Sequence, residues 1–67
     1  MRITYCPDTD TALLQFSSGT PAETRELDEN VYLDLDAAGH IVSLTVEHAR
    51  EAAGMDEFSY TRVPAPA

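Results

Sequence analysis

The segment from residue 31 to residue 46 constrains the fold most strongly, because apolar side chains alternate with other residues along two consecutive runs. Alternation with a period of two is typical of a β-strand that buries one face. The runs are separated by Ala37-Ala38-Gly39, a short segment that ends in glycine. The pattern therefore predicts an antiparallel hairpin whose buried positions are Val31, Leu33, Leu35, Val42, Leu44 and Val46.

The register of this hairpin follows from which residues must share a face. A two-residue loop of residues 38 and 39 pairs Leu35 with Val42 and places every Val and Leu of the pattern on one side. A three-residue loop would pair Leu35 with Ile41 and bring Ser43 and Thr45 to the apolar side. We therefore expect a loop of even length, of two or four residues, in which Gly39 supplies a positive φ.

Weaker patterns complete the predicted fold. Strands are expected at residues 2–5, 12–16 and 22–27, with Asn30 in a left-handed corner before the hairpin. Residues 47–53 favour a short helix that ends at Gly54. The predicted fold class is α+β: a small antiparallel β-meander of four or five strands, with a short C-terminal helix packed on one face.

The length of 67 residues allows one hydrophobic core. We expect a single β-rich domain over residues 1–60, in which Met55, Phe58 and Tyr60 pack behind the helix, and a flexible tail over residues 61–67. A chain this short has modest stability, and Cys6 is the single cysteine, so no internal disulfide supports it. Association with a second chain is one usual remedy.

The charge balance excludes several classes of partner. Twelve acidic residues against four arginines, with no lysine, give a net charge of −8. This charge repels phosphates, so we expect no nucleic acid partner and instead expect self-association or a basic protein partner. No stretch approaches the roughly 20 apolar residues of a membrane span, and no secretory signal follows Met1. We therefore expect a cytoplasmic protein that does not bind membranes.

The polar clusters of the sequence are weak candidates for chemistry. Asp34-x-Asp36-x-x-Gly39 begins like a calcium loop, but later ligand positions hold Ala38 and Thr45. Asp8 and Asp10 flank a threonine in a turn, and we interpret them as residues that fix the turn.

The soft metal ligands are few, and no catalytic set stands out. Cys6, His40 and His48 belong to different predicted elements and are expected to lie apart. The sequence therefore predicts a non-enzymatic protein with no cofactor and no metal site. The alternative that stays open is a small metal-binding protein or hydrolase that uses Asp8, Asp10 and His40.

Exposed aromatic and aliphatic side chains are the candidates for an interface. The predicted register places Tyr32 and Ile41 on the outward face of the hairpin, beside acidic residues. Tyr5 lies in the first predicted strand. We expect Tyr32, Ile41 and Tyr5 to contribute to contact with a partner.

Three segments of the sequence resemble a known family. Tyr5, Pro7, Asp10 and the strand 12–16 resemble the opening Y-D-P-x-x-D-x-L-Y-I-x-L of the DUF2283 family, and residues 23–28 resemble its E-T-E-E-V-D segment. Residues 31–36, Gly39 and residues 41–47 resemble its segment G-V-I-V-D-Y-D-x-D-G-x-V-V-G-I-E-I-L. Departures stand at Cys6, Asn30, Ala38 and Ser43, where the family has Asp, Gly, Asp and Gly.

The resemblance implies a small β-rich fold without an assigned activity. Some family members resemble the product of the gene that is paired with a small toxin-like protein in bacterial operons. This resemblance implies an antitoxin-like role. This association carries no catalytic residue onto the present sequence. The function expected from the sequence is therefore a protein–protein interaction module, acting as a homodimer or as an antitoxin-like partner of a basic protein.

Overall fold

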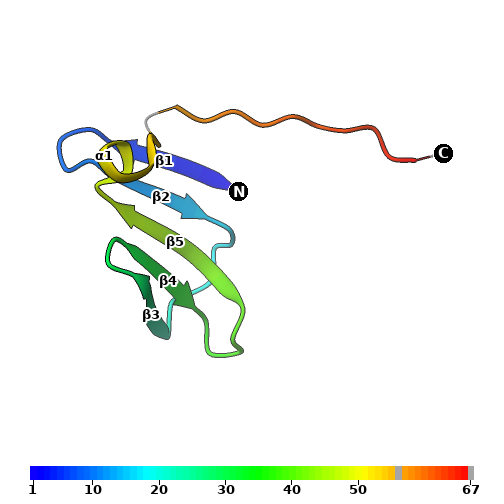
Figure 1. Ribbon diagram of the computed structural model, residues 1–67. Coiled ribbons are helices and arrows are strands. Elements are labelled where there is room, and N and C mark those ends of the chain that lie inside the picture. The colour runs from blue at the N-terminus through cyan, green and yellow to red at the C-terminus, as the bar shows by residue number, and fades with distance from the viewer. Residues whose placement is uncertain (56, 67) are drawn as a thin grey trace.

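A five-stranded antiparallel sheet forms the body of the protein in the computed structural model, which describes residues 1–55 and 57–66 (Figure 1). One short helix follows the last strand, which confirms the predicted α+β class. The elements are β1 (Arg2–Cys6), β2 (Thr11–Gln15), β3 (Glu23–Asp28), β4 (Val31–Leu35), β5 (Ile41–Glu47) and α1 (Ala49–Ala53).

The strands lie in the order β1-β2-β5-β4-β3, so the chain departs from a plain meander at one step. β1 and β2 form one hairpin and β3, β4 and β5 form a meander, but β5 lies between β2 and β4. Residues 16–22, here called the crossing loop, therefore run from β2 past the end of β5 and β4 to reach β3 (Figure 1). Backbone bonds hold the loop there, from Phe16 N–H to Val42 O at 2.8 Å and from Ala22 N–H to Leu35 O at 2.8 Å.

The central hairpin shows the pairing of an odd loop next to the turn and the pairing of an even loop farther from it. Val31 pairs with Val46 and Leu33 with Leu44, as predicted, but the prediction for Leu35 is wrong because it pairs with Ile41. The turn closes with a bond from Gly39 N–H to Asp36 O, and Gly39 has a φ of 84°. A β-bulge between Asp34 and Leu35 then shifts the register by one residue, which restores the pairing that buries the apolar face.

The turn between β3 and β4 also differs from the prediction. Among the described non-glycine residues, positive φ occurs at Asp10 and His48, so the left-handed corner predicted for Asn30 is wrong. The backbone of Glu29 instead donates to the side chain of Asp28 at 2.7 Å. The carbonyl of Asn30 accepts the N–H of Glu47 at 2.7 Å, which fastens this turn to the end of β5.

The main hydrophobic cluster is small and lies at the helix end of the sheet, while Leu35 and Val42 are buried at the other end. Ala12, Val46 and Ala49 form the buried part of this cluster, against which larger, half-buried side chains pack: Tyr5, Leu14, Val31, Leu44 and Met55. Among the described residues, no large side chain falls below 2% exposure. The buried centre therefore consists mainly of small side chains.

Helix α1 ends as the sequence predicts, although it is shorter. Gly54 adopts a φ of 63°, and its N–H donates to Arg50 O while Met55 N–H donates to Ala49 O. The left-handed glycine ends the helix, and the two bonds satisfy carbonyls of its last turn.

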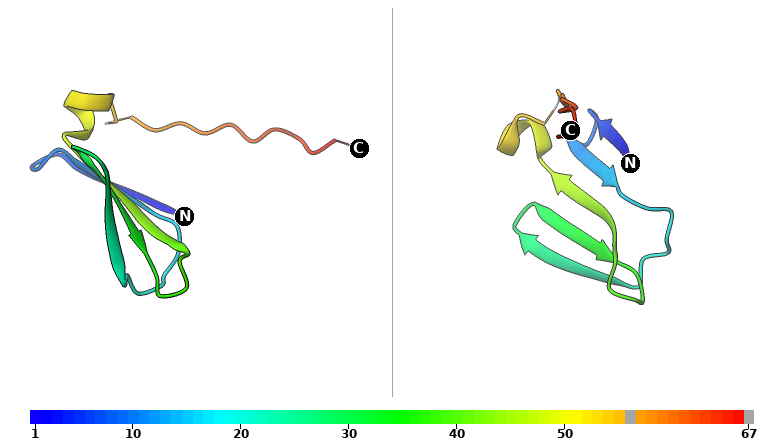
Figure 2. Two further views of the ribbon diagram at one scale, coloured as in Figure 1. Left: turned by 60° about the horizontal axis from the view of Figure 1, so that its bottom comes forward. Right: turned by 90° about the vertical axis from the view of Figure 1, so that its right-hand side faces the viewer.

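The segment that follows α1 leaves the body of the protein. Residues 57–66 form neither helix nor strand and run away from the sheet in Figure 1 and in the left view of Figure 2. Met55 packs against the core as predicted, but Tyr60 is 90% exposed, so its predicted position behind the helix is wrong. Phe58 is also exposed. The predicted flexibility of residues 61–67 stays a prediction, and Ala67 lies outside the described residues.

Candidate functional site

An uncharged apolar surface crosses one face of the sheet. Ile3, Leu14, Leu44 and Leu33 are directly paired across β1, β2, β5 and β4, so their side chains form one row, here called the apolar strip. Ile3 is 41% exposed, and the other three are half-buried. Directly paired residues of antiparallel strands share a face, and the adjoining row of Tyr5, Ala12, Val46 and Val31 is also uncharged.

Two segments cover the ends of this face but leave the apolar strip open. At one end α1 places Ala49 against Ala12 and Val46, and α1 contacts β2. At the other end the crossing loop lies over Val42. A methyl group added to Gly19 of this loop would be 3.6 Å from Val42 Cγ2, which is ordinary van der Waals contact. Val42 and Leu35 are consequently buried there. The apolar strip between these covers has no second layer among the described residues.

The opposite face of the sheet is polar and acidic around Tyr32. Thr4, Leu13, Thr45, Tyr32 and Glu26 form the row of paired residues that crosses it. The Tyr32 hydroxyl donates to Glu29 O at 3.5 Å. The negative charge of Glu47 raises the pKa of Tyr32 above its ordinary value of 10.0, with smaller contributions from desolvation and from Glu26 and Glu29. This polar face therefore carries a negative potential.

Asp34 links three strands on the polar face. The hydroxyl of Ser43 donates to Asp34 Oδ2 at 2.8 Å, and the hydroxyl of Thr24 donates to Oδ1 at 2.5 Å. Ser43 is buried, with 6% exposure. Every buried side-chain polar atom in the described part of the chain has a hydrogen-bond partner. We therefore interpret Asp34 as a structural carboxylate.

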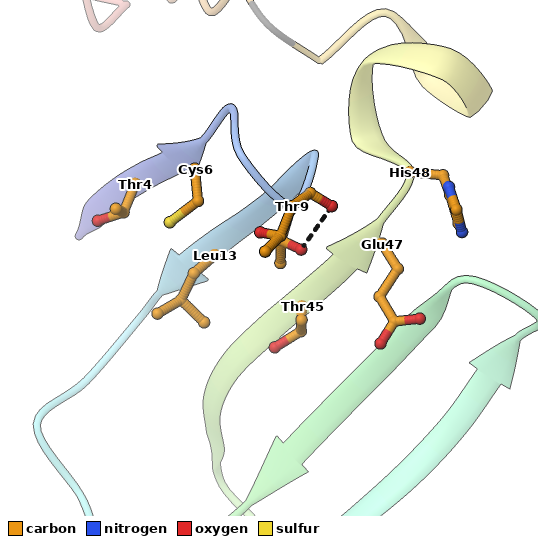
Figure 3. A pocket seen from close by; sticks show the side chains of 8 residues that line it. Thr4, Cys6, Thr9, Leu13, Thr45, Glu47 and His48 are labelled. Atoms are coloured by element: carbon orange, nitrogen blue, oxygen red, sulfur yellow. Dashed lines mark hydrogen bonds between the residues drawn. The ribbon is translucent and has the colours of Figure 1, made fainter.

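A shallow depression on the polar face, here called the threonine depression, has threonines as half of its lining residues. Figure 3 shows that the side chains of Thr4, Cys6, Leu13 and Thr45 project to one side from β1, β2 and β5. Thr9, Thr11, Glu47 and His48 complete its lining. Cys6 is a free, exposed thiol on an edge strand. Enzyme sites usually shield a substrate from water, and the open shape of this depression provides little such shielding.

Asp10 anchors α1 to the first hairpin across 40 residues of sequence. Its carboxylate Oδ1 accepts the Tyr5 hydroxyl at 2.7 Å and the Arg50 N–H at 2.8 Å, and Oδ2 accepts the Glu51 N–H at 3.3 Å. Its backbone carbonyl accepts Ala49 N–H at 2.8 Å. The Tyr5 bond, followed by the Arg50 bond, lowers the pKa of Asp10 below its ordinary value of 3.8. His48 precedes the helix without a side-chain cap, so Asp10 takes that role.

Asp10 also belongs to the group of side chains that comes closest to a metal site. One ligand atom from each of Asp10, His48 and Glu51 lies within 4.8 Å of the others. The Asp10 carboxylate already accepts three hydrogen bonds, which occupy most of its lone pairs. His48 and Glu51 are exposed. We therefore interpret this group as the cap of α1.

The residues of the open hydrolase or metal alternative do not form one site. Asp8 and Asp10 lie in the turn between β1 and β2, near His48. His40 lies at the other end of β5, roughly 23 Å away by the rise of a seven-residue strand. There His40 lies 3.7 Å from Asp36, whose pKa is lowered, most strongly by the N–H of His40. The geometry therefore gives no support to joint chemistry by Asp8, Asp10 and His40.

The three residues predicted for an interface lie in three places. Tyr5 is on the apolar face with its hydroxyl bonded to Asp10, while Tyr32 is on the polar face. Ile41 is 47% exposed beside the central turn, roughly 13 Å from the Thr45 that pairs with Tyr32. Their role in binding stays a prediction.

The sequence indicated that the members of the apolar strip are inward-facing or strand residues, but it did not predict that they align in one row across four strands. Their alignment depends on β5 pairing with β2, and no local pattern encodes that choice.

The model of one protein family, described as a protein of unknown function (DUF2283), matches residues 2–50. The chain belongs to the DUF2283 family. The match covers all five strands and the first residues of α1, so the sheet and both of its faces lie within the family region. No curated protein and no solved structure matches the chain. Family membership therefore assigns the domain without assigning an activity.

Two further features of this DUF2283 chain concern its single cysteine and its helix. Cys6, where the family resemblance has Asp, lies at the end of β1 and lines the threonine depression. Among the residues that the structure describes, no helix is both long enough and apolar enough to cross a membrane.

Proposed function

We propose that this DUF2283 chain is a non-enzymatic protein–protein interaction module that acts as a homodimer. The observation that carries the proposal is the uncharged apolar strip, which α1 and the crossing loop leave open. A sheet normally buries its apolar face against a second layer. In this chain that layer consists of a five-residue helix and a loop.

The arrangement of acid–base groups supports a role other than catalysis. Asp10 and Asp36 use their carboxylates to bind backbone N–H groups, and Asp34 binds two hydroxyls. His40 and His48 are exposed and lie at opposite ends of β5. A general base must reach its substrate in a shaped site, and these groups instead serve turns and a helix end.

A second candidate function is that of an antitoxin-like partner for a basic protein. It is favoured by the negative charge around Tyr32, where Glu47, Glu26 and Glu29 act together. Such a field accelerates the approach of a positively charged protein, and high salt weakens it.

Light scattering after size-exclusion chromatography, over a series of protein concentrations, tests the proposed function. The expected mass is that of two chains at high concentration. A parallel pull-down from the native host tests the antitoxin-like alternative. A mass of one chain at every concentration, together with no basic protein recovered, would refute both forms of the module.

A further inference from the structure

We infer that two copies of this chain pack apolar strip against apolar strip and form a two-layer β-sandwich. This inference rests on the proposed homodimer and specifies its surface and geometry. Sheets that pack face to face keep their strands within about 30° of each other and interdigitate their side chains. The apolar strip supplies one such layer in each copy.

Charge identifies a second copy as the occupant. Two chains of net charge −8 repel each other wherever their acidic groups meet. On the apolar face, the paired rows through β1, β2, β5 and β4 carry no charged side chain. Where the strip ends at β3, Arg25 forms an ion pair with Glu23. Contact through this face therefore keeps most acidic groups outside the interface.

Charge on β3 distinguishes the two symmetric orientations. Glu23 pairs with Leu35, so an acidic side chain lies on the apolar face at its β3 edge. A two-fold axis perpendicular to the strands would place β3 of one copy against β3 of the other. A two-fold axis parallel to the strands keeps the two β3 strands apart.

The same axis brings unlike strands together. β1 of one copy faces β3 of the other, so the uncharged side chains of Ile3 and Tyr5 lie near the strand on which Arg25 is paired with Glu23. Because β5 is central, Leu44 faces the Leu44 of the second copy. Leu14 faces Leu33 of the second copy, since their strands flank β5 on either side.

Isotope-filtered NMR on a mixture of labelled and unlabelled chains tests this geometry without altering the sequence. The expected result is a set of contacts between chains that joins the methyl groups of Leu14 to those of Leu33. Contacts between Leu14 and its own counterpart would overturn the orientation. Three other results would overturn the sandwich. They are contacts between chains only at Thr4 and Thr45 of the polar face, contacts only between the two β1 edge strands, and contacts from Tyr60 of one chain to the apolar strip of the other.

A matched pair of variants tests the same surface by affinity. Leu14 and Leu13 are neighbours on β2 whose side chains lie on opposite faces. Leu14→Glu buries a charge in the proposed interface and should raise the dimer dissociation constant by roughly 100-fold. Leu13→Glu should change it by less than about threefold. Equal effects, in variants shown by circular dichroism to be folded, would overturn the inference.

The outcomes separate this inference from the proposed function. A dimer whose contacts lie on another surface overturns the sandwich and leaves the interaction module intact. A chain that stays monomeric but binds a basic protein also overturns the sandwich, and it favours the antitoxin-like form of the module. A monomer with no partner overturns both.

Discussion

Replacing Val46 by alanine tests whether α1 rests on the sheet as described. Val46 is 6% exposed and packs with Ala12 and Ala49. The substitution removes two methyl groups, each worth about 0.8 kcal/mol of burial. The alanine neighbours have no longer side chains that fill the space, so a cavity adds to the loss. We expect the free energy of unfolding to fall by about 2 kcal/mol, a large fraction of the stability of a chain this small.

Urea denaturation followed by circular dichroism measures this loss. Protein concentration is held constant, because association contributes to the apparent stability. Val63→Ala is the matched control, since Val63 is 79% exposed in the segment after α1 and should lose nothing measurable. A loss below about 0.5 kcal/mol for Val46→Ala, with an unchanged denaturant slope, would show that the helix does not pack on β5 in solution.

Three other perturbations address the polar contacts and the central turn. Ser43→Ala removes a hydrogen bond to the Asp34 carboxylate and should lower the free energy of unfolding by about 1.5 kcal/mol in the same assay. The exposed Ser18→Ala should have no effect, and equal losses would argue against the bond. The pKa of Asp10 is lowered in the folded state, so its ionised carboxylate stabilises the fold at pH values above its ordinary pKa of 3.8. This stabilisation is lost as the pH falls through the lowered pKa. Acid titration should therefore show a flatter pH dependence of stability for Asp10→Asn than for Asp8→Asn, and identical profiles would refute the cap. Gly39→Ala should cost about 1 kcal/mol through its positive φ alone, because a Cβ there meets no atom within 4 Å; an unchanged thermal midpoint would contradict this.

The central hairpin shows what the sequence pattern predicts and where it fails. Burial of one face determines the pairing of Val31 and Leu33, because a slip there would expose a whole apolar row. Near the turn, local bonding decides instead. The side chain of Asp36 accepts the N–H groups of Ala38 and His40, which stabilises a turn of odd length. The β-bulge reconciles the two demands, and alternation alone does not locate it.

The cap of α1 was beyond prediction because its parts are distant in sequence. Asp10 reaches Arg50 and Glu51 only after β2 has paired with β5. The sequence marked Asp8 and Asp10 equally as turn residues, and the fold assigns the tertiary role to Asp10. The strand order was similarly hidden, since alternation shows which face is buried but not which strand lies alongside.

The position of β5 in the sheet has a consequence for how the chain is made. β5 is the last strand to leave the ribosome, yet it joins the β1–β2 hairpin to β4 and β3. The first hairpin has no lasting neighbour until residues 41–47 have been synthesised. A nascent chain stopped before residue 41 would therefore hold two short, separate pieces of sheet. A single late segment thus decides whether the whole domain folds, and pairing over such sequence separations slows the process.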